Sequence, residues 1–203
     1  VGDYDEISVA GFFDVTLVAG NEGELTIEGE SNLLEYIETE VNGDRLTIKV
    51  KNKQNLKTSW GKDIKIRVPF RDLNQVSLSG SGEIMSTDVI KANNFRVSVS
   101  GSGDINLVVE ASSTESRVTG SGDLVLRGST RDHETSVTGS GDLEAGRFKA
   151  DNVDAKVTGS GDIRVSCDKS IRARVTGSGD IEYVGNPTKQ DTKVSGSGDI
   201  SRG

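Results

Sequence analysis

A four-residue turn, Gly-Ser-Gly-Asp or once Gly-Ser-Gly-Glu, recurs through the last two thirds of this chain. The first glycines of successive turns lie 21, 19, 19, 20, 18 and 19 residues apart. The turn glycines are Gly80, Gly82, Gly101, Gly103, Gly120, Gly122, Gly139, Gly141, Gly159, Gly161, Gly177, Gly179, Gly196 and Gly198. Self-similarity at a nearly fixed period indicates a repeat architecture, in which each repeat forms one small structural unit.

The residues that flank each turn repeat as well, and they are apolar. The residue two positions before each turn is Leu78, Val99, Val118, Val137, Val157, Val175 or Val194. The residue directly after the acidic one is Ile84, Ile105, Leu124, Leu143, Ile163, Ile181 or Ile200. A flexible Gly-Ser linker would have no reason to keep apolar residues at these offsets, whereas alternation before each turn is typical of a short strand.

The repeat length limits the fold to a coil of strands. A strand–helix–strand unit needs about thirty residues or more, and no helical apolar stripe fills the residues between turns. We therefore predict an all-β, right-handed parallel β-helix with one rung of about 19 residues per repeat. The valines at 118, 137, 157 and 175 should align in one inward column. We expect the two turn glycines to allow positive φ and to leave no Cβ that would obstruct the stacked rung. The Ser or Thr before each turn should stack as a hydroxyl ladder.

The first third of the chain lacks this turn but is also rich in strand patterns. Residues 13–17, 46–50 and 64–68 alternate between apolar and polar side chains. Asn42-Gly43 predicts a hairpin between 37–41 and 45–50, and Ser31 could cap one helical turn. We expect a single solenoid domain over 1–203, with irregular rungs and a cap in 1–75 and regular rungs in 76–203.

Composition excludes several kinds of protein. The chain carries 32 acidic and 24 basic residues, a net charge of -8, which argues against a nucleic-acid partner because phosphate binding needs a concentrated basic face. No run of eighteen apolar residues predicts a transmembrane segment. No signal peptide is recognisable in this chain. No cofactor motif is present, so no cofactor is expected.

At this point the sequence resembles a known family. The strand Phe13-Asp14-Val15-Thr16-Leu17, the Val-x-Gly-Ser-Gly-Asp-Ile repeats and the late segment 181–187 are similar to the putative auto-transporter adhesin, head GIN domain family. This resemblance implies a β-helix and export to the periplasm, the outer-membrane surface or the medium. It implies no catalytic residues.

The repeated acidic residues form the one candidate binding ladder. They are Glu83, Asp104, Asp123, Asp142, Asp162, Asp180 and Asp199. Carboxylates suit calcium, but calcium-binding β-rolls have shorter repeats with a denser glycine pattern. We favour the interpretation that each carboxylate accepts hydrogen bonds from the N–H groups of its own turn, so no metal site is predicted.

Three other side chains were weighed as sites. His133 lies in the polar stretch 130–134 and is expected to be a solvated loop residue, not part of a catalytic triad. Alternation from Ile163 and Val165 points Cys167 inward, as an unreactive small hydrophobe. Trp60 is expected to pack in the cap, since no aromatic row accompanies it as a sugar platform would require.

These patterns favour a non-enzymatic binding or scaffold domain of the cell envelope, or a secreted one. Its partner would be a surface protein or a glycan, and a homo-oligomer is left open. The alternative is a polysaccharide lyase or hydrolase, which β-helices also host. Such an enzyme needs acidic residues beside a basic one in a groove, and no rung breaks the repeat with that combination.

Overall fold

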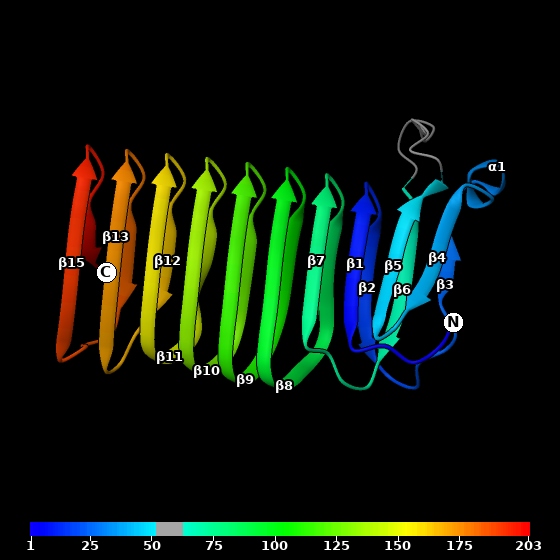
Figure 1. Ribbon diagram of the computed structural model, residues 1–203, viewed down its shortest axis with the longest axis horizontal. Helices are drawn as coiled ribbons and strands as arrows, with labels where there is room; N and C mark the ends of the chain where they lie inside the picture. The colour runs from blue at the N-terminus through cyan, green and yellow to red at the C-terminus, as the bar shows by residue number, and fades with distance from the viewer. Residues whose placement is uncertain (52–62) are drawn as a thin grey trace.

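The computed structural model describes residues 1–51 and 63–203, and these form a β-solenoid of about seven turns. The rungs wind right-handedly around one interior, and the turns stack along one edge (Figure 1). Two faces result, which we call the front sheet and the rear sheet from their positions in Figure 1. The predicted fold class is confirmed.

The strands divide between the two sheets. The front sheet contains β1 (Glu6–Gly11), β4 (Ile37–Asn42), β5 (Arg45–Val50), β7 (Gln75–Gly80), β13 (Ser170–Gly177) and β15 (Lys189–Gly196). The rear sheet contains β2 (Asp14–Ala19), β3 (Thr26–Glu28), β6 (Lys65–Phe70), β12 (Ile163–Ser166), β14 (Ile181–Val184) and β16 (Ile200–Arg202). Four longer strands run down the rear sheet, bend and return up the front sheet: β8 (Glu83–Gly101), β9 (Asp104–Gly120), β10 (Leu124–Gly139) and β11 (Leu143–Gly159).

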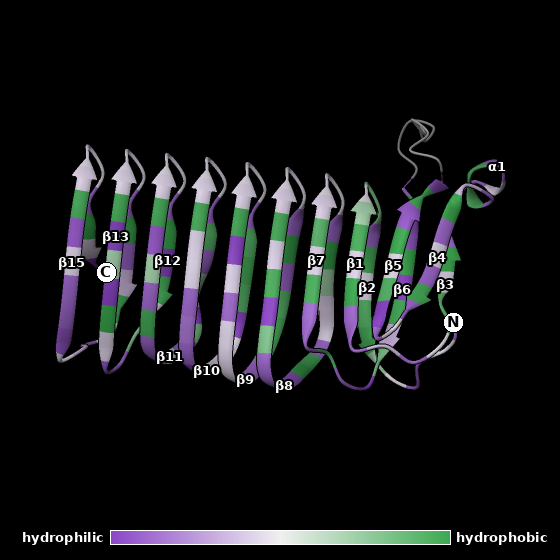
Figure 2. Ribbon diagram, viewed as in Figure 1, coloured by the Kyte–Doolittle hydropathy of each residue, from purple (hydrophilic) through white to green (hydrophobic). Residues whose placement is uncertain are grey.

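Consecutive rungs pair in parallel and in register, so equivalent side chains stack in columns. Val118, Val137, Val157 and Val175 are direct partners in this order, and each is at most 1% exposed. Along most strands the hydropathy alternates, as Figure 2 shows in green and purple, whereas β15 is hydrophilic over most of its length. The predicted inward column is confirmed, and burial of such columns supplies the main stabilisation of the fold.

Both turn glycines allow the predicted close stacking of rungs, but only the first has the predicted positive φ. At Gly139 φ is +122°, and an added Cβ would lie 2.3 Å from the carbonyl oxygen of Gly120 in the preceding rung. Gly141 does not have a positive φ, yet its Cβ would lie 2.1 Å from the oxygen of Gly122. The first glycine is therefore required both for its positive φ and for the close approach of adjacent rungs, whereas the second is required only for that close approach.

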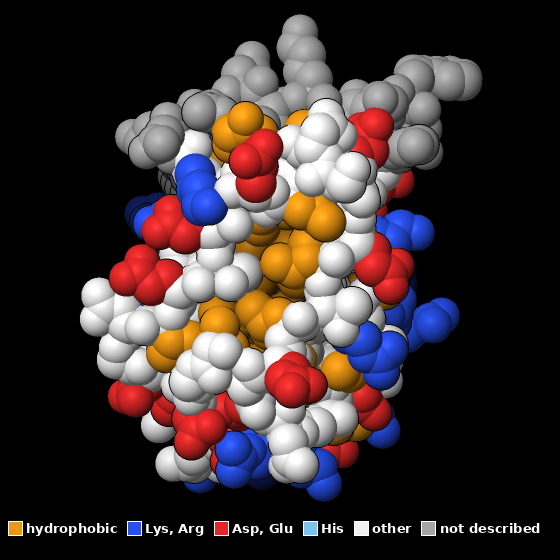
Figure 3. Space-filling view, turned by 90° about the vertical axis from the view of Figure 1, so that its right-hand side faces the viewer, with side chains coloured by type: hydrophobic (Ala, Val, Ile, Leu, Met, Phe, Trp, Pro, Cys, Tyr) orange, Lys and Arg blue, Asp and Glu red, His pale blue; other side chains and the backbone are white. Residues whose placement is uncertain are grey.

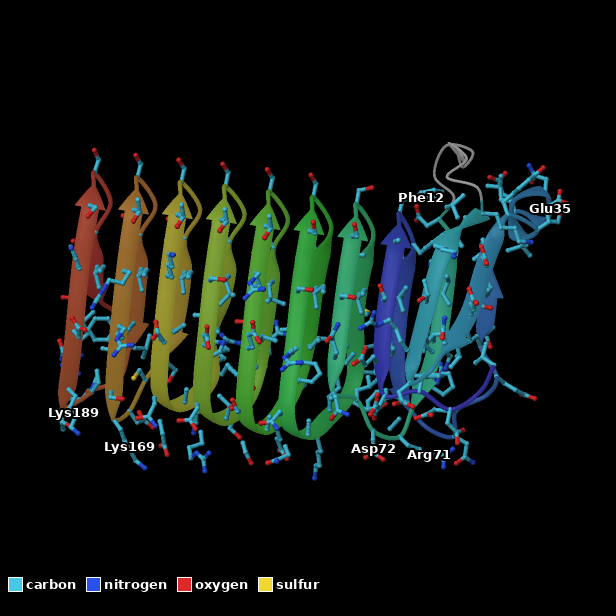
Figure 4. All side chains as sticks on the ribbon, in the orientation of Figure 1. Phe12, Glu35, Arg71, Asp72, Lys169 and Lys189 are labelled. Carbon is cyan, nitrogen blue, oxygen red and sulfur yellow. The ribbon has the colours of Figure 1, made fainter. Side chains whose placement is uncertain are left out.

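The N-terminal strands do not come first along the solenoid axis. β1 pairs in parallel with both β5 and β7, and β2 pairs in parallel with both β6 and β8. Gly11 aligns with Gly80 and Asp14 with Glu83, so 11–14 form a divergent version of the repeated turn. Phe12 projects from this turn (Figure 4). The expectation that the first third lacks the turn motif is wrong.

The end of the solenoid opposite to the C-terminal rungs is formed by the remaining early strands and α1 (Ser31–Leu34). β4 and β5 form the predicted antiparallel hairpin, with Gly43 at φ +61° in its turn. The predicted cap is wrong: Ser31 is the first helical residue, Glu30 precedes it, and that position makes no side-chain capping hydrogen bond. Seen from this end, apolar side chains line a hollow framed by polar ones (Figure 3). Within the described residues, no helix has the length and apolar character needed to cross a membrane.

Candidate functional site

The acidic ladder lies where each turn enters the rear sheet. Every member is solvent-exposed, and each starts or immediately precedes the rear-sheet part of its rung. The members include Glu83, which aligns with Asp14 in the preceding rung and with Asp104 in the next. The ladder therefore continues one rung beyond the regular repeats, into the N-terminal turn.

Hydrogen bonds join the carboxylates from rung to rung. The N–H of Asp123 donates to Oδ1 of Asp104 at 3.0 Å, and the N–H of Asp142 donates to Oδ1 of Asp123 at 3.0 Å. The same bond continues from Asp162 to Asp142, from Asp180 to Asp162 and from Asp199 to Asp180 at 2.7–2.9 Å. Glu83 is not part of this series, because the N–H of Asp104 donates to the Gly82 carbonyl. The bonds thus link successive turns, whereas we had expected them within each turn.

This geometry gives the five accepting carboxylates, those of Asp104, Asp123, Asp142, Asp162 and Asp180, a structural use that needs no cation. Neighbouring carboxylates about 4.8 Å apart repel by about 0.9 kcal/mol in water, and a hydrogen bond to a charged acceptor contributes about 1.5–3 kcal/mol. Among residues 1–51 and 63–203, no group of three or more His, Cys, Asp or Glu side chains is arranged to hold a metal ion.

We expect the melting temperature to be the same in a chelator and in millimolar calcium. The reason is that the N–H groups already satisfy the inner oxygens of the ladder. Thermal melts monitored by circular dichroism test this directly. Calorimetry that detected stoichiometric calcium uptake, lost in the double variant Asp123→Asn with Asp142→Asn, would contradict the prediction and make the ladder a metal site.

His133 is buried, so its assignment to a solvated loop is wrong. Its side chain lies in the interior column between Thr114 and Val153 and is 2% exposed. Ser116 Oγ donates to Thr135 Oγ1 at 2.9 Å and lies 2.8 Å from His133 Nε2, so the two hydroxyl groups and the imidazole are linked by hydrogen bonds. Burial lowers the pKa of His133 to about 4.

A buried Ser–His pair of this kind is not an activated nucleophile. Nδ1 of His133 has no hydrogen-bond partner among the described residues, so no carboxylate orients the ring. The ring packs edge-on against Phe148, with centroids 5.2 Å apart. The polar residues Thr114, Ser116, His133 and Thr135 therefore form an internal cluster of the core.

Cys167 is fully buried, as predicted. Its Sγ donates to the carbonyl of Ser170 at 3.0 Å, and burial raises the pKa of the thiol. Both features disfavour the thiolate that reactive cysteines need. Trp60 lies outside the described residues.

Two surface grooves were not predicted. The polar groove, on the front sheet near its lower bend, has a volume of about 480 Å³ and includes Asp132, Asn152, Ser170, Arg172 and Asp191. Its hydrogen-bonded floor runs across rungs, because Asn152 Nδ2 donates to Asp132 Oδ1 at 2.8 Å and Ser170 Oγ donates to Asn152 Oδ1 at 2.7 Å. Register alone could have found this column, since Asp132, Asn152 and Ser170 are stacked partners.

The second groove lies on the rear sheet. We call it the arginine groove; it has a volume of about 460 Å³ and includes Arg127, Glu144, Gly146, Arg147 and Arg164. It could not be read from the repeat, because it depends on an irregularity in the pairing of β10 and β11.

Two carboxylates of the polar groove, those of Asp132 and Asp191, are held in their charged form. A hydrogen bond from Arg131 lowers the pKa of Asp132, with Asn152 contributing, and a hydrogen bond from Arg174 lowers that of Asp191. A general acid needs the opposite shift, toward neutral pH. The groove is therefore suited to accepting and donating hydrogen bonds, and less to proton transfer.

Comparison with known proteins agrees with this architecture. A putative adhesin from Bacteroides fragilis NCTC 9343 has a similar structure, with a TM-score of 0.88 and 25% identity over 100% of this chain and 93% of that one. A putative lipid binding protein from Parabacteroides distasonis ATCC 8503 is similar in fold, with a TM-score of 0.79 and 24% identity over 100% and 94% of the two chains.

The remaining comparisons concern sequence. A search of curated proteins found no match. The sequence model of one family matches residues 3–187, a range that includes six of the seven repeated turns. The chain belongs to the putative auto-transporter adhesin, head GIN domain family.

Proposed function

We propose that this chain is an exported, non-enzymatic binding module that contacts a surface glycan through the faces of its solenoid. One observation carries the proposal: the turns and the apolar columns that flank them are nearly constant from rung to rung, whereas outward positions vary. One column of register partners on the front sheet varies in the sign of its charge with no regular period: Arg96, Glu115, Glu134, Asp154, Arg172 and Asp191. A rigid scaffold with a variable exterior is how repeat proteins present binding surfaces.

The chemistry of the polar groove favours a hydroxyl-rich partner. Amide, hydroxyl and carboxylate groups lie side by side there, and Arg172 forms ion pairs with Asp154 at 3.2 Å and Asp191 at 3.7 Å. Such groups can exchange hydrogen bonds with sugar hydroxyls at little desolvation cost, because they are already partly exposed. Membership of an adhesin family supports the same proposal.

A lyase or hydrolase is the second candidate, because the polar groove brings acidic and basic side chains together. The lowered pKa of Asp132 and Asp191 disfavours it, since neither carboxyl can hold a proton near neutral pH. Arg172 is also engaged by two carboxylates. We therefore expect binding without turnover.

A glycan array with the purified chain tests the proposal, together with assays for turnover. We expect retention of at least one class of glycan and no release of reducing ends or unsaturated products from pectin, alginate or glycosaminoglycans. Turnover that a single substitution in the polar groove abolished would replace the proposal with the enzyme. Capture of a surface protein from an envelope extract, with no glycan retained, would replace the glycan with a protein partner.

A further inference from the structure

The arginine groove exists because one strand carries an extra residue. Val125 of β10 pairs with Glu144, but Arg127 pairs with Arg147, so the register shifts within this short stretch. The extra residue bulges the strand locally and re-aims the side chains around it. The irregular pairing thereby turns a flat part of the rear sheet into a groove of about 460 Å³.

Gly146 keeps this groove open. A Cβ at this position would lie 2.9 Å from Oε1 of Glu144 and 3.2 Å from Nε of Arg164. The Gly146 N–H also donates to Glu144 Oε1 at 2.9 Å, which holds that carboxylate against the backbone. Any larger residue would have to push the surrounding charged side chains outward.

Three guanidinium groups line the groove, against one carboxylate. Arg127 donates to the uncharged Asn106 Oδ1 at 2.7 Å, and Arg164 pairs with Glu182 at 3.2 Å. Arg147 forms no ion pair or hydrogen bond with the described residues. A local excess of positive charge on a chain of net charge -8 marks a place where an anion is attracted while the rest of the surface repels it.

We propose that the arginine groove binds a carboxylate-bearing polysaccharide, that is, a chain of uronate residues. Guanidinium groups match carboxylates through two parallel hydrogen bonds. The groove crosses successive rungs β10, β11, β12 and β14, which stack about 4.8 Å apart. A linear polymer with an anionic group on each sugar can therefore meet more than one arginine, while Val125 and Val184 offer apolar contact to the sugar rings.

This inference rests on the proposed function, since it names a class of glycan and a contact on the rear sheet in addition to the polar groove of the front sheet. Titration calorimetry of the full chain with oligogalacturonate at low salt tests it. We expect Arg147→Gln to weaken binding about tenfold, as for the loss of one charge-assisted contact. The matched control is Lys156→Gln, which removes the same charge from an exposed residue of the front sheet and should leave the affinity unchanged.

Titrations with two further polymers test whether binding requires the carboxylate group. Fully methyl-esterified oligogalacturonate should not bind, because it lacks the negative charge. Dextran sulfate should bind more weakly than oligogalacturonate, because the guanidinium groups match the geometry of a carboxylate. Equal affinities of Arg147→Gln and the parent would overturn the inference. Retention of neutral glycans with no affinity for uronates would overturn the inference but leave the proposed function standing, whereas failure with every glycan would overturn both.

Discussion

Replacing Gly139 by valine is expected to lower the free energy of unfolding by about 4 kcal/mol or more. A β-branched residue at φ +122° has strained backbone, which costs about 1–3 kcal/mol. Its Cβ would also lie 2.3 Å from the Gly120 carbonyl oxygen, and relieving such an overlap costs a similar amount. Because each rung pairs with both neighbours, the strain cannot be confined to one loop.

The neighbouring residue supplies a control for this substitution. Ser140 is exposed on the same turn, so Ser140→Val adds the same β-branched side chain without entering the stacked backbone. Urea melts of both variants should show a large loss only for Gly139→Val. If the two variants unfolded at the same urea concentration, the stacking of the glycine corner would not be a determinant of stability.

The second large effect concerns acid. The pKa of His133 is about 4 in the folded chain against about 6.5 for an exposed histidine, so the unfolded chain binds the extra proton between these values. Stability is therefore complete above about pH 6.5 and falls as the pH drops toward 4. The shift corresponds to about 3 kcal/mol lost over this window.

His133→Val isolates this contribution, because valine already occupies the next position of the column at Val153. Carboxylates that titrate at low pH act equally on both proteins. We therefore expect the difference in unfolding free energy between parent and variant to change by about 3 kcal/mol between pH 7 and pH 4. Parallel pH profiles of the two proteins would show that the imidazole is not desolvated.

The regular rungs could be predicted because their information is local. Each of the seven turns has apolar residues at the same offsets, so the register between strands could be predicted from the spacing of the turns alone. The burial of His133 could have been predicted from the same alternation. Counting back from Val137 in steps of two places Thr135 and His133 inward, but the polar character of 130–134 outweighed the alternation.

The order of the N-terminal rungs could not be read from the sequence in the same way. The fragment Val9-x-Gly11-x-x-Asp14-Val15 retains the apolar and acidic positions of the turn. Phe12 and Phe13 replace its Ser and second Gly, so the motif is not recognisable in the sequence. Nothing local indicates that β1 lies between β5 and β7. The two grooves could not be predicted from the sequence for a different reason. They depend on outward side chains and on one bulge, and the repeat specifies neither.

The position of β1 between β5 and β7 has a consequence for how the chain closes on itself. In the regular rungs, equivalent residues of adjacent rungs are only about one repeat apart in sequence, as are Asp104 and Asp123, which are 19 residues apart. At the N-terminus, Ser77 meets the carbonyl of Ile7 across 70 residues. Closing that longer loop costs about 1 kcal/mol more in chain entropy. The amino-terminal strand β1 thus lies between two strands that do not pair with each other, and it fixes the position of both.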